Sequence, residues 1–186
     1  MTRILLLTAP RGAGKTTACE RMIQRAREAG LSVGGILTPA RYDASGAKSG
    51  FYAVDLASGE QRELAIVASD EAQRTVGRFR FDADALAWAA ERALWALNAP
   101  LDVVVIDEIG PLELERGQGF ASALAALPQA RARAAILIVR TELALRLQEL
   151  LRAMRPIVIV LTQRDRDQIP TRLLEEVWRR DESGRI

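Results

Sequence analysis

The residue types that could do chemistry are concentrated in two short segments, and the first lies near the N-terminus. Residues 9–17 read Ala-Pro-Arg-Gly-Ala-Gly-Lys-Thr-Thr and follow closely on the apolar run 4–7. This is the phosphate-binding-loop pattern G-x-x-x-x-G-K-[ST], with Ala9 in place of the first glycine. The backbone N–H groups of such a loop converge on phosphate oxygens at a helix N-terminus, where the helix dipole favours anions. The segment therefore predicts a phosphate-binding site.

Each residue type in this loop has an expected role. Lys15 is expected to reach the β- and γ-phosphates of a nucleotide as a compact point charge, and the Thr16 hydroxyl is expected to bind Mg²⁺. Gly12 and Gly14 keep side chains out of the concavity that receives the phosphates. Ala9 precedes a proline, a position biased to extended dihedrals that alanine accepts easily. The expected nucleotide contacts are Ala9, Pro10, Arg11, Gly12, Ala13, Gly14, Lys15, Thr16 and Thr17.

The second segment is an apolar run, 103–106, that ends in the acidic pair Asp107 and Glu108. In phosphate-loop enzymes a strand of this kind places its Asp near the Mg²⁺ site. The next residue, Glu108, can orient a water molecule for attack on the γ-phosphate, which fits hydrolysis better than transfer. We therefore expect Lys15 and Glu108 to be catalytic, Thr16 and Asp107 to bind metal, and Mg²⁺ to be the cofactor.

Residues 106–114, Ile-Asp-Glu-Ile-Gly-Pro-Leu-Glu-Leu, are more specific than a generic acidic strand end. They closely resemble the motif of the small P-loop nucleoside-triphosphatase family that includes the cancer-related nucleoside triphosphatase and its thermophile (THEP-type) counterparts. Residues 35–38, 50–56 and 76–82 also resemble that family, so the resemblance covers nearly the whole chain. It implies Mg²⁺-dependent hydrolysis of nucleoside triphosphates, such as ATP and GTP, to diphosphate and phosphate, with little discrimination among bases.

The composition of the 186 residues excludes several other chemistries. The chain has no His and one Cys, Cys19, which excludes His-dependent acid–base catalysis, a Ser-His-Asp triad, a His-ligated metal and an internal disulfide. Only two of the 26 basic residues are lysines, Lys15 and Lys48. The net charge of +2 gives little support to a nucleic-acid partner. No stretch approaches the ~18 apolar residues of a membrane span, so we expect a cytoplasmic protein without membrane contact.

The elements that must position these residues alternate as in an α/β fold. Helical patterns have expected caps at Asp82 and Thr141, with Pro170 in the first turn of the last helix. We expect a single P-loop nucleoside-triphosphatase domain over 1–186, built as a three-layer sandwich around a mainly parallel sheet. Turn-like sequences predict an antiparallel hairpin inserted at about 38–67. Five short apolar runs have the composition of parallel strands buried on both faces: 4–7, 33–37, 103–106, 136–139 and 157–161.

The sequence alone does not decide which further residues contact the γ-phosphate, and it leaves other functions open. Arg11, Arg140 and Thr141 are candidates for sensing the γ-phosphate. A nucleotide or small-metabolite kinase would use the same loop, but it needs an acceptor pocket and commonly an Arg-rich lid, which the sequence does not identify. A slow nucleotide-operated switch would turn over feebly until a partner is added, and a nucleic-acid-dependent ATPase is less favoured still. The preferred base and the oligomeric state are not specified by any residue pattern.

Overall fold

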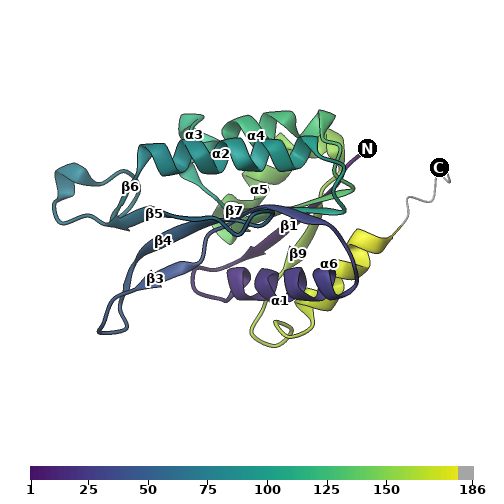
Figure 1. The fold of residues 1–186 in the computed structure, drawn as a ribbon, viewed down its shortest axis with the longest axis horizontal. Coiled ribbons are helices and arrows are strands. Elements are labelled where there is room, and N and C mark those ends of the chain that lie inside the picture. Colours follow the sequence, from purple (N-terminus) through teal and green to yellow (C-terminus); the bar gives the residue numbers. More distant parts are fainter. Residues whose placement is uncertain (180–186) are drawn as a thin grey trace.

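The computed structural model describes residues 1–179, in which a nine-stranded sheet lies between two layers of helices (Figure 1). All five predicted parallel strands are confirmed. Four of them have apolar residues that are covered on both faces of the sheet, whereas the strand that begins at Ile157 lies at the sheet edge and leaves Val160 49% exposed. The side chains alternate: Ile4 and Leu6 pack in one core, and Leu5 and Leu7 pack in the other. The parallel strands are neighbours in the order β2 (Val33–Leu37), β7 (Val103–Ile109), β8 (Ala134–Arg140), β1 (Arg3–Ala9) and β9 (Ile157–Val160).

The antiparallel portion that the sequence predicts adjoins β2. The added strands are β3 (Ala40–Tyr42), β4 (Lys48–Asp55), β5 (Gln61–Val67) and β6 (Phe79–Phe81). β4 pairs with β2 through its last residues and with β3 through its first residues. β5 pairs with β4. β6 pairs with β5 and so continues the antiparallel portion beyond residue 67. The result is the expected mainly parallel sheet with an antiparallel extension at one edge.

Helices cover both faces of the sheet, which confirms the three-layer arrangement (Figure 1). One face carries α1 (Lys15–Glu28) and α6 (Ile169–Trp178), and the other carries α2 (Ala83–Asn98), α3 (Pro111–Arg116), α4 (Ala121–Ala126) and α5 (Thr141–Leu150). Three short 3₁₀ turns span Glu71–Gln73, Leu127–Gln129 and Arg152–Met154. Within the described part of the chain, no helix is both long enough and apolar enough to cross a membrane.

The predicted helix boundaries hold at two positions and fail at one. Asp82 caps α2, because its carboxylate accepts a hydrogen bond from the Ala85 N–H at 2.8 Å. Pro170 lies in the first turn of α6, as expected. The predicted cap at Thr141 is wrong: β8 continues through Arg140 and α5 begins at the next residue. The cap position therefore falls on Arg140, and Thr141 is already inside the helix.

Candidate active site

The carboxyl ends of β1, β7 and β8 meet at one edge of the sheet, where the phosphate-loop sequence leads into α1. Gly14 is the N-cap of α1 with φ of +93°, and Gly12 has φ of +77°. A Cβ at either position would meet no atom within 4 Å, so the positive φ is what favours glycine within the protein itself. Ala9 is the last residue of β1 and has no positive φ, which explains why alanine is accommodated there.

Lys15 lies buried over the loop. Its Nζ donates hydrogen bonds to the carbonyl oxygens of Ala9 at 2.7 Å and Pro10 at 3.1 Å. Burial lowers the pKa of Lys15, while the nearby carboxylates of Glu108 and Asp107 oppose that change. The ammonium group is therefore held at the start of the loop, close to both acidic residues of β7.

Asp107 is buried at the end of β7 and faces the loop. Its Oδ2 accepts hydrogen bonds from the Thr16 hydroxyl at 3.0 Å and from the Thr38 N–H at 3.1 Å. Its Oδ1 has no hydrogen-bond partner among residues 1–179. Burial raises the pKa of Asp107, and the charge of Glu108 raises it further, against the lowering effect of the hydrogen bonds. The carboxylate and the Thr16 hydroxyl are hard oxygen donors of the kind that bind a small divalent cation.

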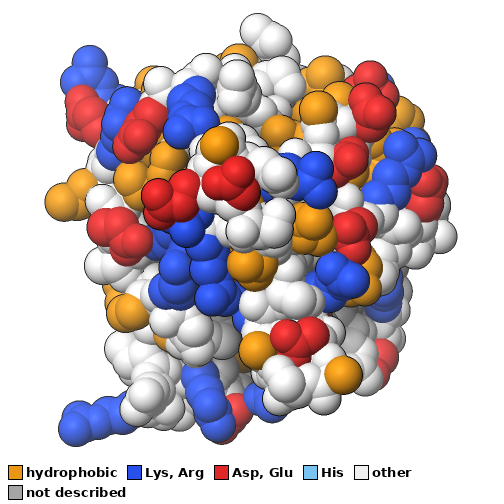
Figure 2. All heavy atoms as spheres, turned by 90° about the vertical axis from the view of Figure 1, so that its left-hand side faces the viewer, with side chains coloured by type: hydrophobic (Ala, Val, Ile, Leu, Met, Phe, Trp, Pro, Cys, Tyr) orange, Lys and Arg blue, Asp and Glu red, His pale blue; other side chains and the backbone are white. Residues whose placement is uncertain are grey.

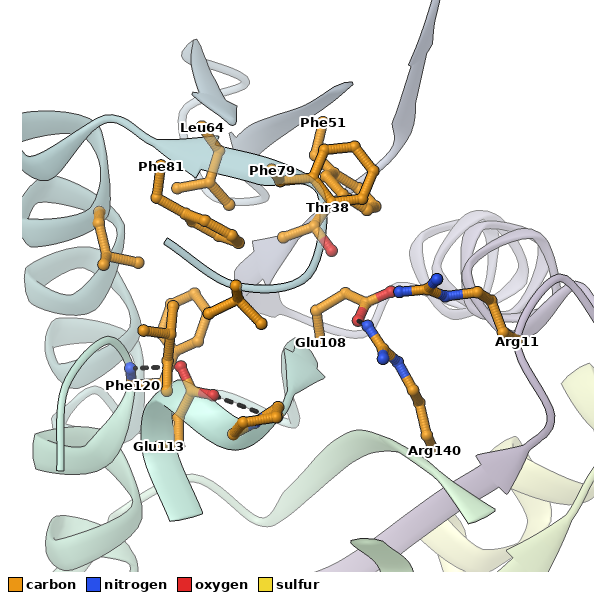
Figure 3. Close-up of a pocket in the computed structure, with 15 residues that line it drawn as sticks. Arg11, Thr38, Phe51, Leu64, Phe79, Phe81, Glu108, Glu113, Phe120 and Arg140 are labelled. Atoms are coloured by element: carbon orange, nitrogen blue, oxygen red, sulfur yellow. Dashed lines mark hydrogen bonds and ion pairs between the residues drawn. The ribbon is translucent and has the colours of Figure 1, made fainter. Parts of the chain in front are cut away.

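Glu108 has an unusual backbone conformation. Its φ of +64° lies in the left-handed region, and the pairing of β7 with β8 loses its register between Ile106 and Ile109. Irregularities of this kind re-aim side chains beside active sites. The Glu108 side chain, 34% exposed, lies with its Oε2 3.6 Å from Nη2 of Arg140. The guanidinium groups of Arg11 and Arg140 lie close to the Glu108 carboxylate (Figure 3).

The three candidates for sensing the γ-phosphate differ in whether they line the site. Arg140, at the end of β8, and Arg11, in the loop, both line the hollow that contains Lys15 and Glu108. Thr141 does not line this hollow and is exposed in the first turn of α5. The side chains of the two arginines therefore reach the site, and that of Thr141 does not.

Sequence reasoning missed Lys48 and Thr38 as members of the site. Lys48, at the start of β4, lines the same hollow, and its Nζ lies 3.7 Å from the centre of the Phe51 ring. Burial lowers the pKa of Lys48, although the charge of Glu108 opposes this. The scarcity of lysine in a chain rich in arginine was a signal that could have identified Lys48. The backbone contact of Thr38 with Asp107 depends on the pairing of β2 with β7, which no local pattern contains.

The hollow over the loop has a volume of about 370 Å³, within the usual range for ligand pockets. Its basic side chains are Arg11, Lys15, Lys48 and Arg140. Figure 2 looks onto this side of the molecule and shows Lys and Arg side chains gathered near the middle of the face, with acidic side chains beside them. The hollow therefore suits an extended anion.

Comparisons with known proteins agree with this geometry. A family model described as NTPase matches residues 4–174. The nucleoside-triphosphatase THEP1 of Methanopyrus kandleri is 34% identical over 179 residues, which cover 95% of this chain and 96% of that protein. THEP1 of Thermofilum pendens is 30% identical, with 92% and 93% of the two chains covered.

Solved structures give the same result. The solution structure of a human cancer-related nucleoside triphosphatase is 26% identical, covers all of both chains and superposes with a TM-score of 0.76. The crystal structure of THEP1 from Aquifex aeolicus shares the fold, with a TM-score of 0.69, 20% identity, and 94% and 99% of the two chains covered. The resemblance drawn from residues 106–114 is therefore confirmed. This chain belongs to the NTPase family, and it is an enzyme of that family.

Proposed function

We propose that this protein hydrolyses nucleoside 5′-triphosphates, ATP and GTP among them, to nucleoside diphosphate and phosphate with Mg²⁺ as cofactor. The observation that carries the proposal is the convergence of three groups at one edge of the sheet. Lys15 lies over the phosphate loop, the pair Thr16 and Asp107 lies beside it, and the re-aimed Glu108 faces the same hollow. The names of the relatives support nucleoside-triphosphatase activity.

The loop and its lysine bind the triphosphate. The N–H groups at the start of α1 would donate hydrogen bonds to phosphate oxygens, and Lys15 would place its charge against the β- and γ-phosphates. In the structure, the Lys15 ammonium already lies over the loop, where it donates hydrogen bonds to two backbone carbonyl oxygens. A γ-phosphate is therefore expected at the end of the hollow that Lys15 and Glu108 share.

Glu108 would orient the attacking water and accept its proton. Its carboxylate lines the hollow, and its Oε2 lies 3.6 Å from Nη2 of Arg140. Arg140 and Arg11 are placed to stabilise the charge that develops on the γ-phosphate oxygens. Positioning and electrostatic stabilisation of this kind carry most of the catalysis of phosphoryl transfer.

Thr16 and Asp107 would hold the Mg²⁺ ion together with oxygens of the substrate. Residues 1–179 contain no cluster of three or more acidic or Cys side chains that could hold a metal without the substrate. The free Oδ1 of Asp107 and the Thr16 hydroxyl fit Mg²⁺, which commonly uses one or two carboxylates plus substrate phosphates. The bound ion would neutralise charge on the β- and γ-phosphate oxygens.

Broad base tolerance is supported by the residues at the other end of the loop. A hollow of about 140 Å³ there is lined by Gly14, Thr17, Ala18, Arg21 and Arg166. Arginine side chains can stack on any base, because every base has a π-face. This end of the site therefore favours a nucleoside without selecting one base edge.

The test is phosphate release from ATP, GTP, CTP and UTP, with and without Mg²⁺. We expect release from all four with rates within about tenfold of one another, because stacking discriminates weakly among bases. Release should require Mg²⁺ and fall by at least about 10²-fold in Thr16→Ala. Thr171→Ala removes a hydroxyl on α6 that does not line the hollow over the loop, and it is the matched control. Release that persists at full rate in EDTA would contradict the metal requirement.

A further inference from the structure

A second pocket adjoins the hollow over the phosphate loop (Figure 3). Its volume of about 50 Å³ is several times what one water molecule requires. Strands β4, β5 and β6 supply one part of its wall, α2, α3 and the residue before α4 supply another, and residues at the ends of β2, β7 and β8 and in the phosphate loop complete it. Its apolar lining includes Phe51, Leu64, Phe79, Phe81, Leu112 and Phe120.

The pocket opens at the catalytic end of the phosphate site. Arg11, Glu108 and Arg140 line both hollows, so a molecule in the pocket would meet these three side chains. The nucleoside of a bound triphosphate is attached to the α-phosphate, which the loop holds near Thr17. Glu108 marks the opposite, γ-phosphate end. The nucleoside therefore leaves the loop in the other direction and does not fill this pocket.

Hydrolysis gives no reason for an apolar pocket at this place. A water molecule is held by polar partners, and an aromatic wall supplies none. An apolar concavity with a few charged groups at its mouth is instead the usual form of a small-molecule site. The lining thus indicates a second ligand with an apolar ring and a polar group at its end.

The pocket is held open by buried contacts. The Glu113 carboxylate accepts hydrogen bonds from the Gly110 N–H at 2.8 Å and from the Phe120 N–H at 3.1 Å, one on each oxygen. Phe51 and Phe79 pack edge to face, with ring centres 4.8 Å apart. These contacts fix two walls of the pocket before any ligand arrives, so little ordering is needed for binding.

We propose that this pocket is an acceptor site, which takes the ring of a small alcohol and places its hydroxyl at Glu108 for phosphorylation. The hydroxyl oxygen attacks the γ-phosphorus, and the bond from that phosphorus to the β–γ bridging oxygen breaks, with its electron pair leaving on the nucleoside diphosphate. The hydroxyl proton passes to the Glu108 carboxylate and then to solvent. The phosphate monoester formed lies beside Arg11 and Arg140. The proposal rests on the proposed function for triphosphate binding and for the role of Glu108.

The probe is 4-fluorobenzyl alcohol, which carries one ring, one hydroxyl and a fluorine nucleus. We expect its ¹⁹F resonance to broaden and shift when the protein is added. With ATP and Mg²⁺, ³¹P NMR should show 4-fluorobenzyl phosphate accounting for part of the ATP consumed. In Leu86→Trp, a larger side chain at the pocket wall, ester formation should fall at least tenfold while phosphate release without the probe stays unchanged. Leu94→Trp, two turns further along α2, is the matched control.

The outcomes separate this proposal from hydrolysis. Phosphate release without ester, with or without a ¹⁹F change, overturns the acceptor site and leaves hydrolysis standing. Ester formed without phosphate release in the absence of the probe supports the acceptor site and contradicts hydrolysis. Ester formation that is unchanged in Leu86→Trp shows that the alcohol reacts elsewhere, and it overturns the assignment of this pocket.

Discussion

At the scale of single residues, the sequence identified which side chains belong to the site better than how they are aimed. The types and order of Lys15, Thr16, Asp107 and Glu108 follow from two local patterns. The aim of Glu108 does not, because it depends on a left-handed backbone and a lost register that no residue type specifies. Lys48 was missed for a related reason, since it lines the hollow through the pairing of β4 with β2 and β3, which its residue type does not specify.

Arg140 is expected to matter to catalysis, and its neighbour Thr141 is not. Replacing Arg140 by Ala removes the guanidinium group near Glu108 and should lower kcat by about 10²-fold, with a smaller change in KM. Thr141→Ala removes a hydroxyl that lies outside the hollow, so its kinetics should match the wild type. Steady-state phosphate release measures both variants, and equal losses in the two would contradict the assignment.

The buried Asp55, by contrast, stabilises the fold away from the loop. Its Oδ2 accepts hydrogen bonds from Nε of Arg92 at 2.9 Å, from Nη2 at 2.7 Å and from the Ser58 hydroxyl at 2.7 Å. Arg92→Ala should therefore lower the free energy of unfolding by about 2 kcal/mol in urea denaturation at pH 7. Arg74→Ala breaks an exposed ion pair with Glu71 and should cost less than about 1 kcal/mol.

The contribution of Asp55 should depend on pH. Burial alone would raise the pKa of Asp55, but the hydrogen bonds from Ser58 and Arg92 outweigh it and hold the pKa below its ordinary value. A carboxylate with a lowered pKa stabilises the folded state above about pH 4, and this contribution is lost as the pH falls through the folded-state pKa. The difference in stability between wild type and Arg92→Ala should thus be constant from pH 7 to about 5 and shrink below about pH 4. A difference that grows in acid would contradict this account.

At the scale of elements, the parallel strands were predictable because burial on both faces leaves a continuous apolar run. The N-cap of α5 was not predictable, because β8 passes directly into the helix. Arg140, the last residue of β8, takes the cap position, and Thr141 is already helical. Strand β6 was not expected either, since three residues are too few for a period to show. Local pattern thus predicts long buried elements and misses short ones.

Gly35 shows how closely β2 and β7 approach. Its φ is +99°, and a Cβ there would lie 2.1 Å from the carbonyl oxygen of Val105. Gly35→Ala should therefore separate the two strands and cost more than about 4 kcal/mol of stability. Gly46→Ala, at a φ of +80° with no atom within 4 Å of the Cβ, should cost only about 1 kcal/mol. Thermal unfolding of the two variants compares these costs, and similar losses would show that conformation rather than contact governs Gly35.

At the scale of the whole molecule, the sheet brings two kinds of surface together at one edge. The parallel half supplies the phosphate loop and the acidic pair, and the antiparallel extension supplies the aromatic wall beside them. The phosphate loop and the acidic pair were predictable because each is a contiguous stretch of the sequence. The aromatic wall was not, because it comes from several elements that are far apart in the chain. The acceptor pocket that sequence reasoning did not identify is therefore a product of the tertiary structure.

Binding of a nucleotide should stabilise the whole fold through this edge. ADP with Mg²⁺ at 100 times its Kd should add about 2.7 kcal/mol to the free energy of unfolding and raise Tm by roughly 5 to 10 °C. Lys15→Ala removes the loop ammonium and should show no shift in Tm at the same concentration of ADP and Mg²⁺. Differential scanning fluorimetry measures both, and an equal shift in Lys15→Ala would contradict nucleotide binding at the loop.

The most direct test of the central claim is phosphate release by Glu108→Gln with ATP and Mg²⁺. The amide keeps the size of the side chain but cannot accept a proton, so we expect release to fall by at least about 10²-fold. The thermal shift with ADP and Mg²⁺ should remain, because Lys15 and the loop are intact. Undiminished phosphate release in Glu108→Gln would contradict the claim that this carboxylate activates the water.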